Sequence, residues 1–201
     1  MEANERHRAS KTDCKLQALY TVGGTPGELP QVPHVRDHPR SGCPINAGLE
    51  ALGDPWALLV LRDLVFGDRR HFRALLEHSE EGIASNILAS RLKALVAGGL
   101  LTRDDAVRGQ RAAYTLTEAG IQTVPIMVAL GSWGLAHRPG TPELRIRAEL
   151  LRDGGPELCE QFMDELRETH LGTPRRRPDR PTASERLERA YEQLAGSGGA
   201  G

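Results

Sequence analysis

The chain has 201 residues, of which 39% are hydrophobic and 26% are charged, and its formal net charge is −1. This length fits one domain of ordinary size with extensions, and the apolar content suffices for a core. The near-zero charge excludes a uniformly basic protein, so attraction to nucleic acid requires a local basic patch. No apolar run has the length of a membrane span, and residues 1–10 have no hydrophobic signal-peptide core, so we expect a cytoplasmic protein without membrane contact.

The two ends of the chain differ in composition from its middle. Residues 1–40 contain four prolines and show no sustained periodicity, and such a segment buries too little apolar surface to offset its ordering entropy. They are expected to form a disordered N-terminal arm. Residues 172–201 begin with an arginine- and proline-rich run, include a short charged helix candidate and end in glycine and serine. They are expected to form a flexible tail.

Helical periodicity begins after this arm. Apolar residues at i, i+4 and i+7 predict a short helix over residues 45–52 that ends at Gly53. Asp54 and Pro55 combine a capping side chain with a proline in the first turn, and so begin a second, mostly apolar helix that ends at Gly67. A third helix is expected over residues 72–78.

A fourth helix is expected over residues 85–97, and its two faces differ sharply. Leu88, Leu92 and Leu95 repeat at i, i+4 and i+7 and face the core. The opposite face carries small or polar side chains, namely Ser85, Asn86, Ala89, Ser90 and Lys93.

Two glycines end the fourth helix, and Gly98 is suited to the left-handed cap conformation. A strand is expected over residues 100–102 and its partner over residues 112–116, while residues 103–111 are polar and have the length of an exposed hairpin. This order describes a recognition helix followed by a β-wing, as in a winged helix-turn-helix. Such a helix and hairpin can read adjacent grooves of one DNA duplex.

Three more helices are expected: one from Thr117 toward Trp133, in which Pro125 introduces a kink, and two over residues 142–151 and 156–170. The expected fold is mainly α, a winged helix-turn-helix with a short antiparallel wing of two or three strands and extra C-terminal helices. The expected division is a disordered arm (1–40), a winged helix-turn-helix domain (41–138), a C-terminal helical extension (139–171) and a flexible tail (172–201).

The order of several short motifs over about Gly42 to Arg138 resembles the HxlR-type winged helix-turn-helix regulators. The motifs are Cys43-Pro44-Ile45, Leu52-Gly53-Asp54-Pro55-Trp56, Leu58 to Asp63, Gly82 to Leu88, Arg91-Leu92, Tyr114 to Glu118 with Gly120, and Trp133-Gly134. The resemblance implies a bacterial homodimeric transcription factor on a near-palindromic operator, with dimer contacts from helices outside the central motif. The family has no common effector, and the flanking segments here are longer than in its minimal members.

The polar face of residues 85–97 is either an ordinary solvated surface or a surface that meets base edges. The adjacent wing and the family resemblance favour base contact. Arg91 lies nearer the apolar face, and we expect it to have a structural role. The predicted DNA-binding residues are therefore Ser85, Asn86, Ala89, Ser90 and Lys93 on the helix, Arg108 and Arg111 in the wing, and Arg70 and Arg73 as phosphate contacts near the third helix.

Cys43 precedes the first helix, whose N-terminus stabilises a thiolate, and some relatives sense oxidants through a cysteine here. The alternative is a cysteine packed at a dimer interface. His34 and His38 lack a fourth ligand beside Cys43, so no metal site is predicted, and no cofactor is expected. No activated nucleophile, paired catalytic carboxylates or phosphate-binding loop supports an enzyme.

Two alternatives to a simple DNA-binding homodimer stay open. The first is a winged helix used only for protein–protein contact, which a net acidic recognition face and wing would favour. The second is a regulator gated by a small-molecule effector in its C-terminal helices, which an enclosed apolar cavity near Trp133 and Phe162 would favour.

Overall fold

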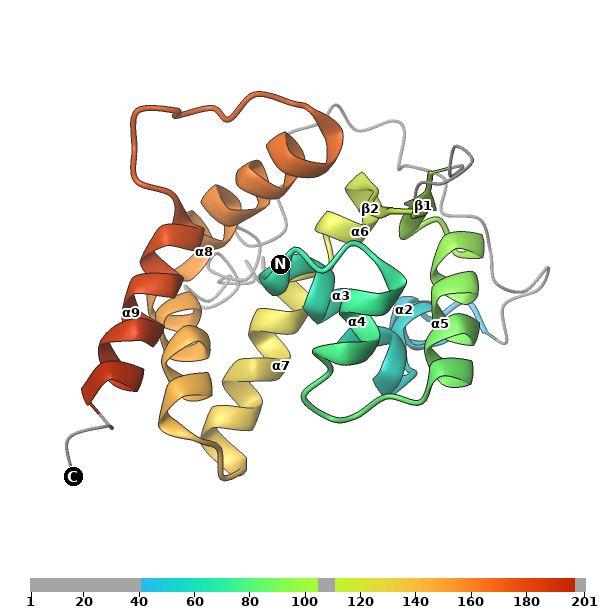
Figure 1. Ribbon diagram of the computed structural model, residues 1–201, viewed down its shortest axis with the longest axis horizontal. Coiled ribbons are helices and arrows are strands. Elements are labelled where there is room, and N and C mark those ends of the chain that lie inside the picture. The colour runs from blue at the N-terminus through green and yellow to red at the C-terminus, as the bar shows by residue number, and fades with distance from the viewer. Residues whose placement is uncertain (1–40, 105–110, 198–201) are drawn as a thin grey trace, which may run out of the picture.

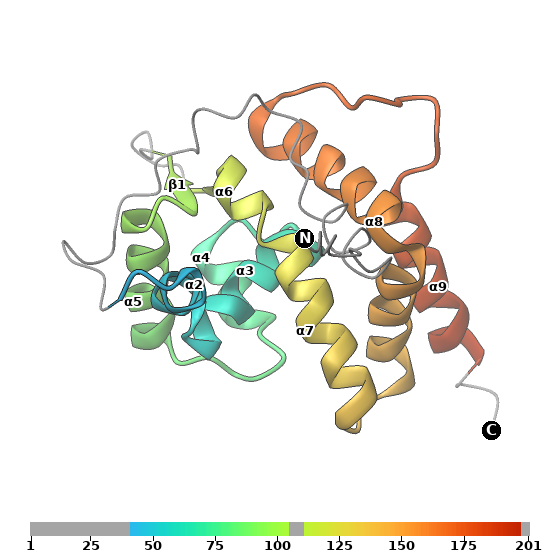
Figure 2. The ribbon, with the colours of Figure 1, turned by 180° about the vertical axis from the view of Figure 1, so that it is seen from behind.

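The structure is a computed structural model that describes residues 41–104 and 111–197. It is mainly helical and contains one small antiparallel sheet, which confirms the expected fold class. Figures 1 and 2 show helices α2 to α5 and the two strands on one side of the molecule and helices α7 to α9 on the other.

The first four described helices match the ranges expected from the sequence. They are α2 (Pro44–Leu52), α3 (Pro55–Gly67), α4 (Phe72–Glu77) and α5 (Ser85–Ala97). Helix α3 begins as predicted, because the Asp54 carboxylate accepts a hydrogen bond from the backbone N–H of Ala57 at 2.9 Å. Leucines from α3, α4 and α5 then meet in the core, where Leu61, Leu64, Leu75, Leu88 and Leu92 are almost fully buried.

Two short strands follow α5. They are β1 (Leu101–Arg103) and β2 (Tyr114–Leu116), and they pair antiparallel with Leu101 opposite Leu116. An isolated bridge joins His71 to Ala113, and the N–H of Tyr114 donates to the Arg70 carbonyl at 2.7 Å. The segment before α4 therefore acts as a minimal third strand at the base of the wing.

The helix expected from Thr117 toward Trp133 is in fact two helices, α6 (Glu118–Ile121) and α7 (Val124–His137). The chain turns at Gln122 and Thr123, and the Thr123 hydroxyl donates to the Gly120 carbonyl at 2.6 Å. Pro125 lies in the first turn of α7, where its missing N–H costs no helical hydrogen bond, so it begins a helix instead of kinking one.

The same segment, Glu118–His137, is long and apolar enough to cross a membrane by length and composition alone. The prediction that no such run is present was therefore too strict. The turn between α6 and α7 nevertheless interrupts the segment, and its first residue, Glu118, forms an ion pair with Arg167. Both features fit a folded helical domain better than a continuous membrane span.

Helix α8 (Pro142–Leu171) contains both of the helical segments expected after residue 141. Between them, Gly155 has φ 61° and ψ −157°, a conformation that only glycine adopts readily, and Pro156 begins the second half. Phe162 in that half stacks on Phe66 of α3, with ring centroids 5.3 Å apart, and so joins the C-terminal helices to the winged helix core.

The short charged helix candidate expected within the tail at residues 172–201 is present in the structure. Residues 183–197 form helix α9 (Ala183–Ser197), which lies along α8, and its Ala183 and Leu187 are buried. The buried Glu165 carboxylate of α8 accepts hydrogen bonds from the N–H groups of Ala183 and Ser184 and so caps α9 from another helix.

Candidate nucleic-acid interface

Helix α5 presents one continuous exposed face. Ser85, Asn86, Ala89, Ser90 and Lys93 are all exposed, whereas the leucines on the other side are buried. The structure thus brings all five predicted base-contact residues together on one surface. Small side chains there permit close approach to a groove, and the amide, hydroxyl and ammonium groups are suited to base edges.

Arg91 holds α5 in place instead of facing solvent. Its Nε donates to the Asp54 carboxylate at 2.7 Å, and that carboxylate also caps α3. Burial alone would raise the pKa of Asp54, but the hydrogen bonds from Arg91 and Ala57 outweigh this effect and lower it. One carboxylate therefore fixes the position of the recognition helix relative to α3, in agreement with the structural role expected for Arg91.

The turns on either side of α5 are also fixed. Arg62 of α3 makes two hydrogen bonds, at 2.6 and 2.9 Å, to the Glu81 carboxylate in the turn that precedes α5. After α5, Gly99 has φ +69° and Gly98 has φ −78°, so the second glycine takes the left-handed position expected of the first. The left-handed residue therefore lies one position later than the sequence pattern suggested, although the helix itself ends at Ala97 as expected.

The wing residues are only partly described. Arg111 is exposed in the segment that precedes β2, and Arg103 is exposed on β1. Arg108 lies outside the described residues. Of the two wing arginines predicted to contact phosphates, Arg111 is therefore the one that the structure describes, and its side chain is exposed.

The two arginines near α4 have different environments. The guanidinium of Arg70 donates to the Thr115 hydroxyl at 2.5 Å and to the Tyr114 carbonyl at 3.3 Å, so it is used inside the wing base and is poorly placed for a phosphate. Arg73 is exposed and pairs with Glu77 at 2.5 Å within its own helix. Of this pair, only Arg73 stays a phosphate-contact candidate.

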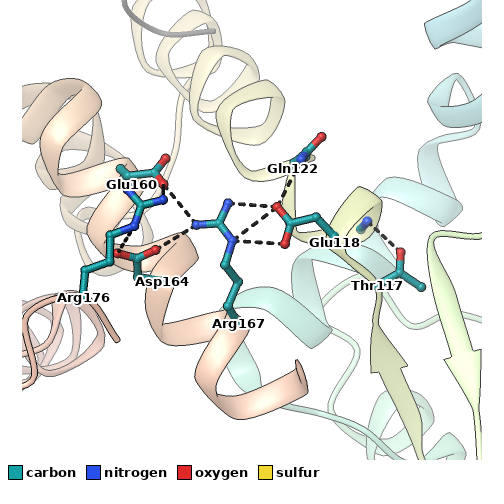
Figure 3. A network of polar contacts seen from close by, with 8 residues as sticks. Thr117, Glu118, Gln122, Glu160, Asp164, Arg167 and Arg176 are labelled. Carbon is teal, nitrogen blue, oxygen red and sulfur yellow. Dashed lines mark hydrogen bonds and ion pairs between the residues drawn. The ribbon is translucent and has the colours of Figure 1, made fainter. Parts of the chain in front are cut away.

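A network of charged side chains supports the wing from the C-terminal helices (Figure 3). Arg167 of α8 donates to both oxygens of Glu118, at 3.0 and 2.9 Å, directly after β2. The hydrogen bond from Arg167 holds the pKa of Glu118 below its usual value. Arg167 also pairs with Glu160 and Asp164, both of which contact Arg176.

Thr117 connects this network to the recognition helix. Its hydroxyl accepts from the Gly120 N–H at 3.1 Å, which caps α6, and donates to the Gly99 carbonyl at 2.6 Å. The turn after α5 and the first turn of α6 are thereby joined through one side chain.

His170, in the last turn of α8, makes a second contact with the wing. Its buried Nδ1 accepts a hydrogen bond from the Leu116 N–H of β2 at 3.3 Å. Burial lowers the pKa of His170, the nearby Arg70 lowers it further, and Asp68 opposes both effects. The roles of His170 and Arg167 could not be predicted from the sequence, because their partners lie 54 and 49 residues away and no local spacing reveals them.

The described part of the interface is net basic. On the exposed face of α5 and in the described wing residues, the cations are Lys93, Arg103 and Arg111, and the only carboxylate is Asp104, which leaves a net charge of +2. Because the net charge of the chain is close to zero, attraction to nucleic acid requires a local basic patch, and these residues form one.

Cys43 is exposed at the N-cap of α2. Cys159 is buried, and burial raises the pKa of its thiol to about 11. Cys14, His34 and His38 lie outside the described residues, and among the described ones no group of three metal-ligating side chains is close enough to hold an ion.

Comparison with known proteins agrees with this geometry. A family model described as HxlR-like helix-turn-helix matches residues 51–141. The chain is 37% identical over 113 residues to the HTH-type transcriptional regulator Rv3095 of Mycobacterium tuberculosis, an alignment that covers 55% of this chain and 70% of the relative. It is 32% identical over 93 residues to the HTH-type transcriptional regulator sll1512 of Synechocystis, which covers 46% and 67%.

The crystal structure of PA1607 aligns with 53% of this chain and 73% of its own, with 32% identity and a TM-score of 0.47. The family match lies on the segment that carries the recognition helix and the wing, and the relatives named above are transcriptional regulators. The chain therefore belongs to the HxlR-like helix-turn-helix family, and it is a transcriptional regulator with a helix-turn-helix domain.

Proposed function

We propose that the protein binds a near-palindromic operator as a cytoplasmic homodimer and regulates transcription by sequence-specific contact. The observation that carries this proposal is the exposed face of α5, where five small or polar side chains lie beside a basic wing. In this arrangement α5 reads base edges in the major groove, while Arg111 and Arg73 contact phosphates.

Exposed apolar side chains support the homodimer. Helix α2 has no buried residue at all, and its Ile45 and Leu49 are 75% and 61% exposed. On α7, Ile126, Leu130 and Trp133 repeat at i, i+4 and i+7 and are also exposed. Figure 2 shows α2 and α7 on the near side of the molecule. We call these five residues the apolar face, and a second copy of the chain is the occupant that the family resemblance suggests.

The net basic charge at the interface argues against a winged helix that serves protein–protein contact alone. An acidic recognition face and wing would favour that alternative, whereas the described residues carry a net charge of +2. Counterion release from DNA phosphates gives such a patch affinity for any duplex, and α5 then supplies the sequence preference.

The test is a selection of the purified protein on random duplexes, followed by affinity measurements on the selected operator. Asn86→Ala and Lys93→Ala should change the preferred sequence and cost about 1–3 kcal/mol per lost base contact. Arg111→Ala should weaken binding to all duplexes alike and flatten the salt dependence, because a phosphate contact is lost. The selected operator should contain two half-sites about one helical turn apart, or a multiple of it.

Arg189→Ala on α9 is the matched control, since Arg189 is exposed and belongs to the other side of the molecule. It should leave both affinity and preference unchanged. Selection of no common sequence, or an altered preference in Arg111→Ala but not in Asn86→Ala, would contradict the proposed division of roles.

An effector-gated regulator is the second candidate function, and one observation favours it. An open apolar groove of about 380 Å³ lies between α3, α7 and α8. It differs from the enclosed cavity expected near Trp133 and Phe162, because Trp133 is 53% exposed and Phe162 is buried against Phe66. The groove is nevertheless built partly from the C-terminal helices, as that candidate requires.

A further inference from the structure

The groove between α3, α7 and α8 has the dimensions and the lining of a small-molecule site. Its volume of about 380 Å³ falls in the range of ligand pockets. Apolar side chains from all three helices form its walls, among them Leu58, Phe66, Met127, Leu144 and Leu151. Its ligand should therefore have an apolar body.

Most charges at the edge of the groove are already neutralised. Arg62 pairs with Asp63 at 2.8 Å and with Glu81 at 2.6 Å. Arg69 pairs with the other Asp63 oxygen at 3.2 Å and donates to the His78 carbonyl. These two arginines thus have little remaining capacity to bind a ligand charge.

Arg147 is the exception among the cations that line the groove. It forms no ion pair with any side chain described in the structure, and its Nε is buried without a hydrogen-bond partner. Its guanidinium carbon lies 4.3 Å from the ring centroid of Tyr191 on α9, which holds the group in place. A buried donor without a partner is costly, and because Arg147 also lines the groove, an anion bound there that reaches its guanidinium would be stabilised.

We propose that this groove binds a small amphipathic anion, a molecule with an apolar body and a single carboxylate or sulfonate group. The apolar walls bind the body, and Arg147 binds the anionic group. Binding of this anion to the groove does not depend on the proposed function. Only an effect of the bound anion on operator affinity rests on that function. The groove-lining residues Leu144, Arg147 and Leu151 lie in the first half of α8, and Arg167 and His170 of the same helix support the wing.

Two fluorescent probes with the same skeleton separate the apolar contribution from the ionic one. They are 1-anilinonaphthalene-8-sulfonate, which carries one anionic group, and N-phenyl-1-naphthylamine, which carries none. Wild-type protein should bind the sulfonate saturably, at one site per chain, and more tightly than the neutral probe. Arg147→Gln should weaken sulfonate binding about tenfold, the size expected for a lost charge-assisted hydrogen bond, and leave the neutral probe within about twofold.

Ala148→Phe should reduce binding of both probes, because Ala148 lines the groove beside Gly131 and a larger side chain would fill it. Arg145→Gln is the matched control, since Arg145 carries the same charge on the same helix but pairs with Glu149 and does not line the groove. Circular dichroism verifies that each variant is folded.

The proposed anion specificity would be overturned if, in wild type and in Arg147→Gln alike, the sulfonate and the neutral probe bound with equal affinity. Binding that persists in folded Ala148→Phe would place the probes elsewhere, for example on the exposed apolar side chains of α2, and would overturn the site. Operator affinity is measured on the same samples without probe. A protein that binds the probe but no operator would refute the proposed function and leave the groove assignment standing.

Discussion

The two ring nitrogens of His170 differ in their surroundings, and this difference makes the histidine sensitive to acid. Nδ1 accepts from the Leu116 N–H, so the neutral ring carries its proton on Nε2. Nε2 is buried without a hydrogen-bond partner and lies 4.0 Å from an Asp68 oxygen, while Arg70 is the nearby cation. Protonation of Nδ1 would remove the acceptor that holds β2.

We therefore expect stability to fall on mild acidification. The folded-state pKa of His170 is lowered from 6.5, so the folded protein binds fewer protons than the unfolded chain between the two pKa values. His170 makes its full contribution to the free energy of unfolding above the unfolded-state pKa. This contribution is lost as pH falls below that value toward the folded-state pKa. The melting temperature should be flat above about pH 7 and decline toward about pH 5, and His170→Gln should decline less over that interval. Identical slopes for wild type and variant would refute this assignment.

The two described cysteines should differ in reactivity toward a thiol reagent. Cys43 is exposed, whereas Cys159 is 5% exposed and its pKa is raised to about 11 by burial. In a Cys14→Ser background, the folded protein should react at one thiol, and the second should react only after denaturation. Cys43→Ser should abolish the native reaction, and Cys159→Ser should leave it unchanged. Native labelling that survives Cys43→Ser would contradict the burial of Cys159.

Among the elements, α8 supports the wing through Arg167 and Glu118. This pair is partly buried, and the guanidinium is fully used by three carboxylates. A double-mutant cycle with Arg167→Ala and Glu118→Ala should give a coupling free energy of unfolding of about 1 kcal/mol or more. The exposed pair Arg73 and Glu77 is the control, for which screening by solvent should leave almost no coupling.

Hydrogen exchange provides a second measurement on the same variants. Loss of Arg167 should increase exchange of the β1 and β2 amides without affecting those in the centre of α3. If the wing amides keep their protection in Arg167→Ala, then α8 does not support the wing.

Elements with strong local signals could be predicted from the sequence. Proline and aspartate at the start of α3, the leucine spacing of α5 and the glycines after it identify the helix-turn-helix and the position of its exposed face. The turn between α6 and α7 could not be predicted, because the segment reads as one apolar run and gives no sign of the hydrogen bond from the Thr123 hydroxyl to the Gly120 carbonyl. A charged helix could be expected in the segment of α9, but its packing could not, because that depends on Glu165 and the apolar surface of α8, which are distant in sequence.

The same limit applies to the interface. The exposed face of α5 follows from helical periodicity, so all five of its predicted residues lie together. The hydrogen bonding of Arg70 does not follow from periodicity, because only the folded chain brings the Thr115 hydroxyl within 2.5 Å of its guanidinium. Sequence shows which side chains carry charge, but tertiary contacts decide which of those charges stay available.

For the whole molecule, the apolar face predicts self-association. Leu49→Glu would place a charge in the proposed interface and should convert a dimer into a monomer at micromolar concentration, as measured by light scattering, with a matching loss of operator affinity. Arg189→Glu introduces a charge of the same sign on the other side of the molecule and should leave both properties unchanged. A wild-type monomer with full operator affinity would refute the homodimer.

The contact between His170 and Leu116 also has a consequence for synthesis of the protein. The ribosome adds about 5–20 residues per second, and the 54 residues that separate this pair therefore take several seconds to make. During that time β2 exists but its last amide has no partner, and the Glu118 carboxylate lacks Arg167. A nascent chain thus carries its recognition helix before the base of the wing is complete, so synthesis of the end of α8 precedes full DNA-binding competence.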